Sequence, residues 1–363
     1  MGWRCGIVGL PNAGKTTIFN ALTAANAEVA AYPFCTINPN EGVVPVPDPR
    51  LAQLGQLLKP ERLTPTTINF VDVAGLISGA SQGEGLGNQF LGQIRETDLI
   101  VHVVRCFEEG RSSHPLGGLD PVRDVAVVET ELLLADLEIL ERHRVKLEKR
   151  RKAGDKQADA GLSVVSRVEA GLNRGRWARD LGLTPKDLAH LSEVPLLTLK
   201  PHIFVANVSE EEFQGGSCLG ALMELGGQRT VPVIPILGDL ETELLDLPKE
   251  EQKDFLESVG LAEPGINRLI QESYRLLGLV TFYTIVGPEV RAWTVPIGTP
   301  APKAAGQVHS DMEKGFIRAE VMQFADLARL GSQARIKEAG LLLVEGRDHV
   351  VQDGEILLFR FQA

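Results

Sequence analysis

Residues 4–16 read RCGIVGLPNAGKT, and this stretch decides the fold of the first half of the chain. A short β-branched run leads into G-x-x-x-x-G-K-T between Gly9 and Thr16, and a helical pattern follows from Lys15 to Ala25. The two glycines let the backbone wrap around a phosphate, the lysine adds a positive charge, and the threonine hydroxyl can ligate Mg²⁺. This context predicts a phosphate-binding loop (P-loop) for a nucleoside triphosphate. The residues expected to contact the nucleotide here are Asn12, Ala13, Gly14, Lys15, Thr16 and Thr17.

The strand pattern predicts a mostly parallel, doubly wound α/β sheet. Short β-branched runs between turn residues indicate buried strands. They are Arg4–Leu10, Thr67–Val73, Leu99–Cys106, His202–Val208 and Val231–Leu237. Helical patterns such as Asn88–Glu96 alternate with the first of these strands, as in a sheet with helices on its faces.

The composition is that of a folded, acidic protein. The chain has 363 residues, of which 44% are hydrophobic, and this length predicts two or three folded units. Lys and Arg number 37 against 48 Asp and Glu, so the net charge of −11 excludes a globally basic protein that coats nucleic acid. No apolar run approaches the roughly 20 residues that cross a bilayer, so we expect no membrane segment. The 4 cysteines lie far apart without a C-x-x-C pair, so they indicate neither a disulfide framework nor a zinc ribbon and favour a reducing cytoplasm.

A long helical tract from Pro121 to Leu191 interrupts the alternation of strands and helices. Its apolar residues repeat at spacings of four and three, which is typical of an antiparallel helical hairpin or short coiled coil. The outgoing seam is Leu133, Leu137, Leu140, Arg144 and Leu147, in which Arg144 is an imperfection, and the returning stripe is Leu162, Val165, Val168 and Leu172. A turn near residues 153–155 is expected to reverse the chain.

The tip of this hairpin carries the densest positive charge in the sequence. The run is Lys149, Arg150, Arg151 and Lys152. Two interpretations stay open, because a charge run is usually solvated surface, whereas adjacent cations can also contact the phosphate backbone of RNA. The sequence favours the first interpretation.

The C-terminal part predicts a separate small α+β domain. Residues 281–298 indicate two strands joined at Gly287-Pro288, and residues 344–361 indicate a second hairpin across Asp353-Gly354. The expected organisation is a nucleotide-binding domain at 1–120 and 195–280, a helical insertion at 121–194, and a C-terminal domain at 281–363.

Two further motifs are typical of a nucleotide hydrolase that acts as a switch. Asp72 and Gly75 form D-x-x-G after a strand, where the aspartate can hold Mg²⁺ through a water and the glycine can sense the γ-phosphate. Thr36 lies in a Pro- and Asn-rich loop between the P-loop and this motif, and we expect it to complete the metal shell when a γ-phosphate is present. The expected metal ligands are therefore Thr16, Thr36 and Asp72.

The base-reading motif departs from that of guanine-specific proteins. Those proteins carry Asn-Lys-x-Asp, whereas this chain has Asn207, Val208, Ser209 and Glu210 at the end of a strand. The aspartate accepts two hydrogen bonds that guanine donates and that adenine does not. A longer glutamate and a valine replace the aspartate and the lysine here, so we predict that ATP is preferred to GTP. Asn207 and the backbone around Val208 are expected to meet the adenine.

On these motifs, the whole chain resembles the YchF/Obg-like ATPase family. Residues 75–107 are similar to Obg-related GTPases, and Asn207-x-x-Glu210 with HSDMEKGFIRAEV at 309–321 narrows the resemblance. The resemblance implies a P-loop domain with a helical insertion, a C-terminal β-grasp (TGS) domain, ATP hydrolysis in preference to GTP, and association with ribosomes. Met312 departs from the family, which usually has an aromatic residue there.

The same resemblance implies a catalytic residue. Leu76 follows the D-x-x-G glycine, and its side chain cannot orient the attacking water as a glutamine does in Ras-like enzymes. The resemblance implies that His114 takes this role once its loop has closed, beside the catalytic Lys15. An asparagine at the position of Asn12 accompanies potassium binding in some related nucleotidases, which makes K⁺ a candidate second cation.

We expect slow intrinsic hydrolysis of ATP. No arginine is evidently poised in the sequence to stabilise the charge that develops on the transferring phosphoryl group. Arg95 and Arg105 are the nearest candidates, and ion pairing is the favoured interpretation for both.

Two other functions stay open beside a ribosome-associated ATPase switch. One is an Obg-type GTPase. The other is an RNA- or ribosome-binding module based on the TGS domain, in which the nucleotide is only a structural ligand. We expect a cytoplasmic monomer, because no strongly apolar exposed stripe is evident outside the hairpin.

Overall fold

The structure, a computed structural model, describes residues 2–24, 40–73, 86–108 and 114–362. The chain divides into two compact units. The first comprises Met1–Val44 and Asn69–Leu269, and the second comprises Pro45–Ile68 and Ile270–Ala363. Each unit has its own six-stranded sheet.

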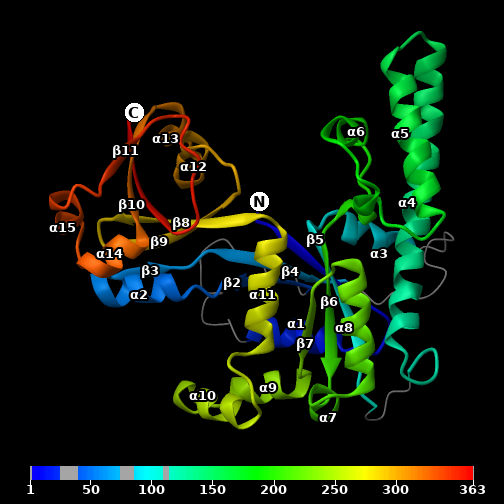
Figure 1. Cartoon of the computed structure of the whole chain (residues 1–363), viewed down its shortest axis with the longest axis horizontal. Helices are drawn as coiled ribbons and strands as arrows, with labels where there is room; N and C mark the ends of the chain where they lie inside the picture. Colours follow the sequence, from blue (N-terminus) through cyan, green and yellow to red (C-terminus); the bar gives the residue numbers. More distant parts are fainter. Residues whose placement is uncertain (1, 25–39, 74–85, 109–113, 363) are drawn as a thin grey trace. The chain divides into compact units, whose positions relative to one another are not determined.

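The sheet of the first unit has the strand order β2-β4-β1-β5-β6-β7 (Figure 1). Its strands are β1 (Arg4–Val8), β2 (Glu41–Pro45), β4 (Thr67–Asp72), β5 (Leu99–Cys106), β6 (His202–Val208) and β7 (Val233–Ile236). β1 pairs in parallel with β4 and β5, and β5, β6 and β7 continue in parallel. The predicted strands and the doubly wound α/β class are confirmed. β1 ends before Gly9 because the P-loop begins there.

Helices pack on this sheet and bury an apolar core. The helices of the first unit are α1 (Lys15–Ala24), α3 (Leu86–Arg95), α4 (Pro121–Lys152), α5 (Gln157–Leu172), α6 (Pro185–His190), α7 (Glu210–Phe213), α8 (Ser217–Arg229), α9 (Gly238–Asp246) and α10 (Lys249–Ser258), and the boundary between the two units falls within α11 (Gly265–Leu276). Val125 of α4 and Leu222 of α8 share a core cluster with Val104 and Phe204 of the central strands. The strands around the carboxyl end of β1 are therefore held between packed layers.

The predicted helical hairpin is present, and α4 and α5 project beyond the sheet of this unit (Figure 1). The reversal lies at residues 153–155, where Gly154 adopts the left-handed conformation with φ 91°. Arg144, the imperfection in the predicted seam, faces the returning helix, where its Nε lies 3.8 Å from Glu169 Oε1 of α5, and it also pairs with Glu141. His143 is buried as well, because helical spacings of three and four from Leu140 and Leu147 also select that position.

A buried carboxylate fixes the middle of α4 to the segment that returns to the sheet. Asp136 is fully buried, and its two oxygens accept hydrogen bonds from the backbone N–H groups of Leu197 and Thr198, both at 2.8 Å, and from the Thr198 hydroxyl at 2.6 Å. Burial raises the pKa of Asp136, and the three hydrogen bonds oppose this shift. The return segment also contains short 3-10 helices at Ala178–Leu181 and Leu197–Leu199.

The sheet of the second unit has the order β11-β10-β12-β8-β9-β3. Its elements are α2 (Pro49–Leu58), β3 (Arg62–Thr64), β8 (Leu279–Val286), β9 (Glu289–Pro296), α12 (Ala301–Val308), α13 (Ser310–Lys314), β10 (Phe316–Gln323), α14 (Phe324–Leu330), α15 (Gln333–Glu338), β11 (Leu343–Glu345) and β12 (Glu355–Phe361). The β8–β9 hairpin across Gly287-Pro288 is confirmed. The predicted second hairpin is wrong, because β10 lies between β11 and β12 and pairs with both.

Residues 45–68 belong to the second unit, although the sequence analysis assigned them to the nucleotide-binding domain. β3 pairs in parallel with β9, and Leu54 of α2 lies in the same core cluster as Tyr283 and Ile356. Arg50 also forms an ion pair with Asp353 at 2.6 Å. No helix in the described ranges carries an apolar stretch long enough to cross a bilayer.

Candidate nucleotide-binding site

The P-loop between β1 and α1 adopts a conformation that requires its two motif glycines. Gly9 has φ 152°, and a Cβ atom there would lie 2.4 Å from the carbonyl oxygen of Val103. Gly14 has φ 89°, and a Cβ atom there would lie 2.1 Å from Asn207 Nδ2. The loop thus presses closely on β5 and β6, and any side chain at either position would force it outward.

The P-loop lysine is buried and held by the loop itself. Lys15 Nζ donates hydrogen bonds to the carbonyl oxygens of Leu10 at 2.9 Å and Gly9 at 3.2 Å. Burial lowers the pKa of Lys15, and the charge of Asp72 opposes this shift. The ammonium group is therefore fixed at the loop and near a carboxylate.

Thr16 and Asp72 come together as the sequence predicts for a metal site. The Thr16 hydroxyl donates to Asp72 Oδ2 at 3.0 Å. Burial raises the pKa of Asp72, while the hydrogen bond from Thr16 and the charge of Lys15 oppose the shift. A hydroxyl and a carboxylate oxygen side by side are ligands that fit Mg²⁺. Thr36 and Gly75, also expected at this site, lie outside the described residues.

A cavity of about 500 Å³ lies at the carboxyl ends of β6 and β7. Val208 and Glu210, both expected at the base, are among its lining residues. The other lining residues carry no motif that predicts them, and they are Glu108, Ser209, Glu211, Leu237, Asp239, Leu240 and Glu243. Their position in the chain could have indicated them. Leu237 to Leu240 follow a parallel strand, and in open α/β folds ligands bind at the carboxyl ends of such strands.

Asn207, expected at the base, also contacts the P-loop. Its side chain is buried, and Nδ2 donates to the carbonyl oxygen of Ala13 at 3.2 Å. Asn207 therefore joins the end of β6 to the P-loop. Thr17 lies nearby on α1, where a Cβ atom on Gly238 would be 3.5 Å from its methyl carbon.

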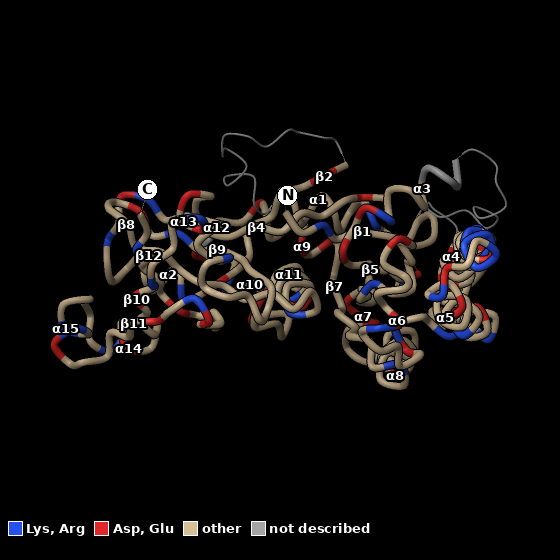
Figure 2. Tube along the Cα trace, turned by 90° about the horizontal axis from the view of Figure 1, so that it is seen from above, with Lys and Arg blue, Asp and Glu red and all other residues tan. Residues whose placement is uncertain are grey.

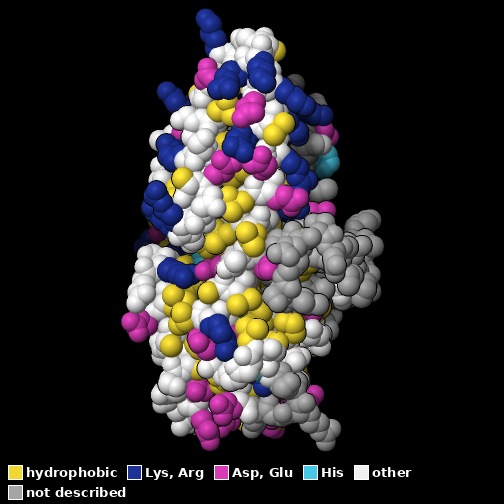
Figure 3. All heavy atoms as spheres, turned by 90° about the vertical axis from the view of Figure 1, so that its right-hand side faces the viewer, with side chains coloured by type: hydrophobic (Ala, Val, Ile, Leu, Met, Phe, Trp, Pro, Cys, Tyr) yellow, Lys and Arg dark blue, Asp and Glu magenta, His cyan; other side chains and the backbone are white. Residues whose placement is uncertain are grey.

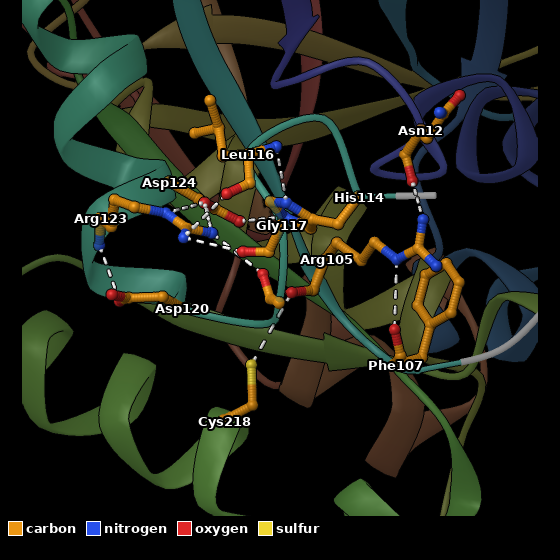
Figure 4. A network of polar contacts seen from close by, with 11 residues as sticks. Asn12, Arg105, Phe107, His114, Leu116, Gly117, Asp120, Arg123, Asp124 and Cys218 are labelled. Carbon is orange, nitrogen blue, oxygen red and sulfur yellow. Dashed lines mark hydrogen bonds and ion pairs between the residues drawn. The ribbon is translucent and has the colours of Figure 1, made fainter. Parts of the chain in front are cut away.

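His114 lies in a network of polar contacts beside the P-loop (Figure 4). His114 Nε2 is 2.7 Å from Asp124 Oδ2, and the exposed fractions of the two side chains are only 7% and 4%. The backbone N–H of Leu116 donates to His114 Nδ1 at 3.2 Å. His114 and Asp124 line a small cavity together with Leu10 and Pro11 of the P-loop. The structure thus brings the predicted catalytic histidine to the P-loop, with both ring nitrogens engaged.

Full-length relatives decide the family of the chain. The Ribosome-binding ATPase YchF of Haemophilus influenzae is 50% identical over 361 residues, which cover 99% of this chain and 99% of that protein. The chain belongs to the YchF family. Proteins of the same name from Escherichia coli O157:H7 and Bacillus subtilis are 48% and 44% identical, each over 99% of this chain. The family expected from the motifs is confirmed.

A solved structure and two family models agree with this assignment to the YchF family. The structure of the Schizosaccharomyces pombe YchF GTPase matches with a TM-score of 0.90 and 32% identity, over 99% of this chain and 98% of that one. The family model MMR_HSR1, described as 50S ribosome-binding GTPase, matches residues 4–131. The model YchF-GTPase_C, described as a protein of unknown function (DUF933), matches residues 279–362.

In this YchF-family chain, Arg105 spans from β5 to the P-loop. The side chain is buried, Nη1 donates to the carbonyl oxygen of Asn12 at 3.3 Å, and Nε donates to that of Phe107 at 3.1 Å. The guanidinium carbon lies 4.4 Å from the centre of the Phe107 ring. Arg105 therefore supports the P-loop backbone at Asn12, the residue at which K⁺ is a candidate.

Arg95 is the other arginine that lies near these motifs in the sequence. Burial lowers the pKa of Arg95, and the charge of Asp136 opposes this shift.

The basic tip lies at the end of α4, where Lys and Arg gather in the tube view (Figure 2). Arg150 pairs with Asp155 at 2.8 Å, and Arg151 lies 3.8 Å from Asp159. Within the described ranges, Lys149 and Lys152 form no ion pair. Positive side chains also dominate the upper end of the face shown in Figure 3. The tip thus keeps exposed positive charge after its internal ion pairs are counted.

Proposed function

We propose that this YchF-family chain is a ribosome-associated ATPase switch, which hydrolyses ATP to ADP and phosphate with Mg²⁺ and changes its affinity for a partner with nucleotide state. The observation that carries the proposal is the P-loop, which holds Lys15 by its own carbonyl oxygens and brings Thr16 to Asp72 at the end of β4. The names of relatives that are 44% to 50% identical over almost the whole chain support it. The proposal includes a cytoplasmic location.

The hydrolysis is an in-line displacement. The oxygen of a water bonds to the γ-phosphorus while the bond to the β,γ-bridging oxygen breaks, which leaves ADP and phosphate. Lys15 and the N–H groups from Ala13 to Thr17 would hold the phosphates, and Gly75 would contact the γ-phosphate. Thr16, Thr36 and Asp72 would hold Mg²⁺, which supplies positive charge against the β- and γ-phosphate oxygens when bound.

His114 is proposed to orient the attacking water. Leu76 occupies the position of the glutamine in Ras-like enzymes and has no group that can hydrogen-bond. The place of His114 beside Leu10 and Pro11 of the P-loop supports this role. The cation proposed at Asn12 is K⁺, and equal rates of hydrolysis in potassium and sodium buffers would argue against it.

Preference for ATP is proposed from the base cavity. Its lining includes Val208 where a guanine-specific protein has lysine, and Glu210 where it has aspartate. The 6-amino group of adenine can donate to a carboxylate, whereas guanine in the same orientation presents its O6 acceptor. An Obg-type GTPase remains the second candidate, since the solved Schizosaccharomyces pombe relative is called a GTPase.

The proposed partner is the ribosome. The basic run Lys149 to Lys152 and the C-terminal unit, proposed as a TGS domain, supply the contacts to RNA in this proposal. The exposed charge at the end of α4 supports the first of these contacts. We propose that the chain acts as a monomer. A module that binds RNA regardless of nucleotide is the remaining alternative.

Isothermal titration with ATP and with GTP, each with Mg²⁺, tests the nucleotide preference. The expected result is tighter binding of ATP, and GTP bound at least about a hundredfold more tightly would overturn it. Co-sedimentation with ribosomes in the ATP and ADP states tests the switch. A Lys15→Ala variant serves as control, because partner binding that ignores both this variant and the nucleotide state favours the module.

A further inference from the structure

The hydrogen bonds of His114 define a particular state of its ring. Nδ1 accepts a hydrogen bond from the N–H of Leu116, so this nitrogen carries a lone pair. Nε2 faces the Asp124 carboxylate at 2.7 Å, so this nitrogen carries the proton and donates it. Neither nitrogen has a lone pair left to accept a hydrogen bond from a water.

The Asp124 carboxylate is held in place by Arg123 and by its position on α4, with one oxygen directed at the His114 ring. Arg123 Nε and Nη2 donate to Asp124 Oδ1 at 3.2 Å and 3.0 Å, which leaves Oδ2 for His114. Asp124 lies in the first turn of α4, where the helix dipole favours a negative charge. Its charge is thus supported from two sides, and it presents one oxygen to the imidazole.

The same arginine ties down the loop that carries the histidine. Arg123 donates to the carbonyl oxygens of Gly117 and Gly118, both at 3.0 Å. Both glycines adopt left-handed φ values, 70° and 62°, that residues with a side chain adopt rarely. The loop from His114 to Gly118 is therefore fixed to the start of α4 at its backbone as well as at the ring.

Among the described residues, the cavity between the ring and the P-loop is small. The cavity that His114 and Asp124 share with Leu10 and Pro11 has a volume of about 10 Å³. A volume of this size holds at most one water, and a phosphoryl group needs more. A histidine that orients the attacking water must therefore leave this position.

From these contacts we infer that Asp124 is a positioning residue that holds His114 in a resting state, and that the His114–Asp124 hydrogen bond breaks before His114 orients the attacking water. This inference rests on the proposed function and deepens it. The hydrogen bond between His114 and Asp124 lowers the fraction of molecules that are competent for hydrolysis, and kcat is proportional to that fraction.

The test compares Asp124→Ala, His114→Ala and the double variant in steady-state ATP hydrolysis. A hydrogen bond to a charged group shifts an equilibrium about tenfold or more, so we expect kcat of Asp124→Ala to rise about tenfold with an unchanged KM for ATP. In the double variant the gain disappears, and kcat equals that of His114→Ala. Asp124→Asn keeps the shape and a weaker acceptor, and its kcat is expected between those of the wild type and Asp124→Ala.

A matched control and a spectroscopic readout separate positioning from folding. Asp120→Ala removes the N-cap at the same end of α4, where Asp120 accepts from the N–H of Arg123 at 3.0 Å, and it leaves the His114 contact in place. We expect its kcat to match the wild type. Nitrogen-15 NMR of the histidine rings without nucleotide is expected to show the Nε2–H form of His114 in the wild type and its loss in Asp124→Ala.

Three results would overturn the inference. One is a fall of kcat to the His114→Ala level in both Asp124 variants with ATP affinity retained, because Asp124 would then assist hydrolysis. The second is a gain in Asp124→Ala that persists without His114. The third is a wild-type NMR spectrum without the Nε2–H form. If His114→Ala hydrolyses ATP like the wild type, the proposed role of His114 fails instead, and the NMR result still decides whether the contact exists.

Discussion

Glu241 gives a pH-dependent prediction that can be worked out from its surroundings. It lies on α9 with an exposed fraction of 4%, and Oε1 accepts from the backbone N–H of Gly265 at 2.6 Å and of Ile266 at 3.4 Å. Burial raises the pKa of Glu241 from the ordinary 4.5 to about 7, against the opposing effect of these two hydrogen bonds. The folded protein therefore retains a proton that the unfolded chain releases between these pH values.

The sign and size of the effect follow from proton linkage. Because the folded state binds more protons in this window, the free energy of unfolding falls as pH rises through it. One pKa unit is equal to about 1.4 kcal/mol. Relative to the fully ionised carboxyl, the proton on Glu241 therefore stabilises the fold by about 2 kcal/mol at about pH 5.5 and by almost nothing at about pH 8.5. Glu241→Gln keeps an acceptor and removes the ionisation. The free energy of unfolding of the variant, relative to that of the wild type, is expected to rise by about 2 kcal/mol from about pH 5.5 to about pH 8.5.

Urea denaturation at the two pH values measures this difference. Fluorescence of Trp177 follows the unit that holds Glu241 if Trp3 and Trp293, the other tryptophans, are changed to phenylalanine in all variants. Glu243→Gln, at an exposed position of the same helix, is the control and is expected to show no such gain. The reasoning is refuted if the wild type becomes more stable relative to Glu241→Gln as pH rises. The two backbone hydrogen bonds would then lower the pKa of Glu241 by more than burial raises it.

Three further predictions concern single contacts. Asn207→Ala removes the hydrogen bond to Ala13, and ATP affinity measured by calorimetry is expected to weaken by about 1 kcal/mol; an unchanged affinity would show that the P-loop holds its shape without it. Asp136→Ala leaves two buried N–H groups and a hydroxyl without their acceptor, so urea denaturation should show a loss of about 3 kcal/mol or more, and a loss below about 1 kcal/mol would contradict this. Leu140→Ala in the hairpin core should lower the free energy of unfolding by about 2–5 kcal/mol, whereas Leu134→Ala on the exposed side should change it by less than about 0.5 kcal/mol.

Local motifs made most of the first unit predictable. The strand, glycine loop and helix from Arg4 to Ala24 are adjacent in the sequence, and their geometry follows from residue type. β5 and β6 were predicted with their observed bounds, because continuous apolar runs mark strands buried on both faces. The meeting of Thr16 with Asp72 also follows, since parallel strands end at one edge of the sheet.

Pairing between distant segments was not predictable from local patterns. The three-residue strand β3 finds its partner β9 more than 200 residues away, and no periodicity in 45–68 signals that pairing. The turn at Asp353-Gly354 looks like a hairpin from the sequence, but β12 pairs with β10 and β8, not with β11, the strand that directly precedes the turn. In the hairpin, His143 and Arg144 fit the helical spacing equally well, and their surroundings come from distant segments: His143 lies near His190 and Glu193, and Arg144 lies near Glu169 of α5.

The length of α4 has a mechanical consequence. Asp124 lies in its first turn and Lys152 at its last residue, and at about 1.5 Å per residue the two are about 42 Å apart along one unbroken rod. Asp136 fixes the middle of the helix, about 18 Å from Asp124, so a tilt of about 6° about that point displaces Asp124 by about 2 Å, which is enough to separate a hydrogen-bonded pair. α4 can therefore act as a lever. A force on its charged end, Lys149 to Lys152, would act on the hydrogen bond between Asp124 and His114.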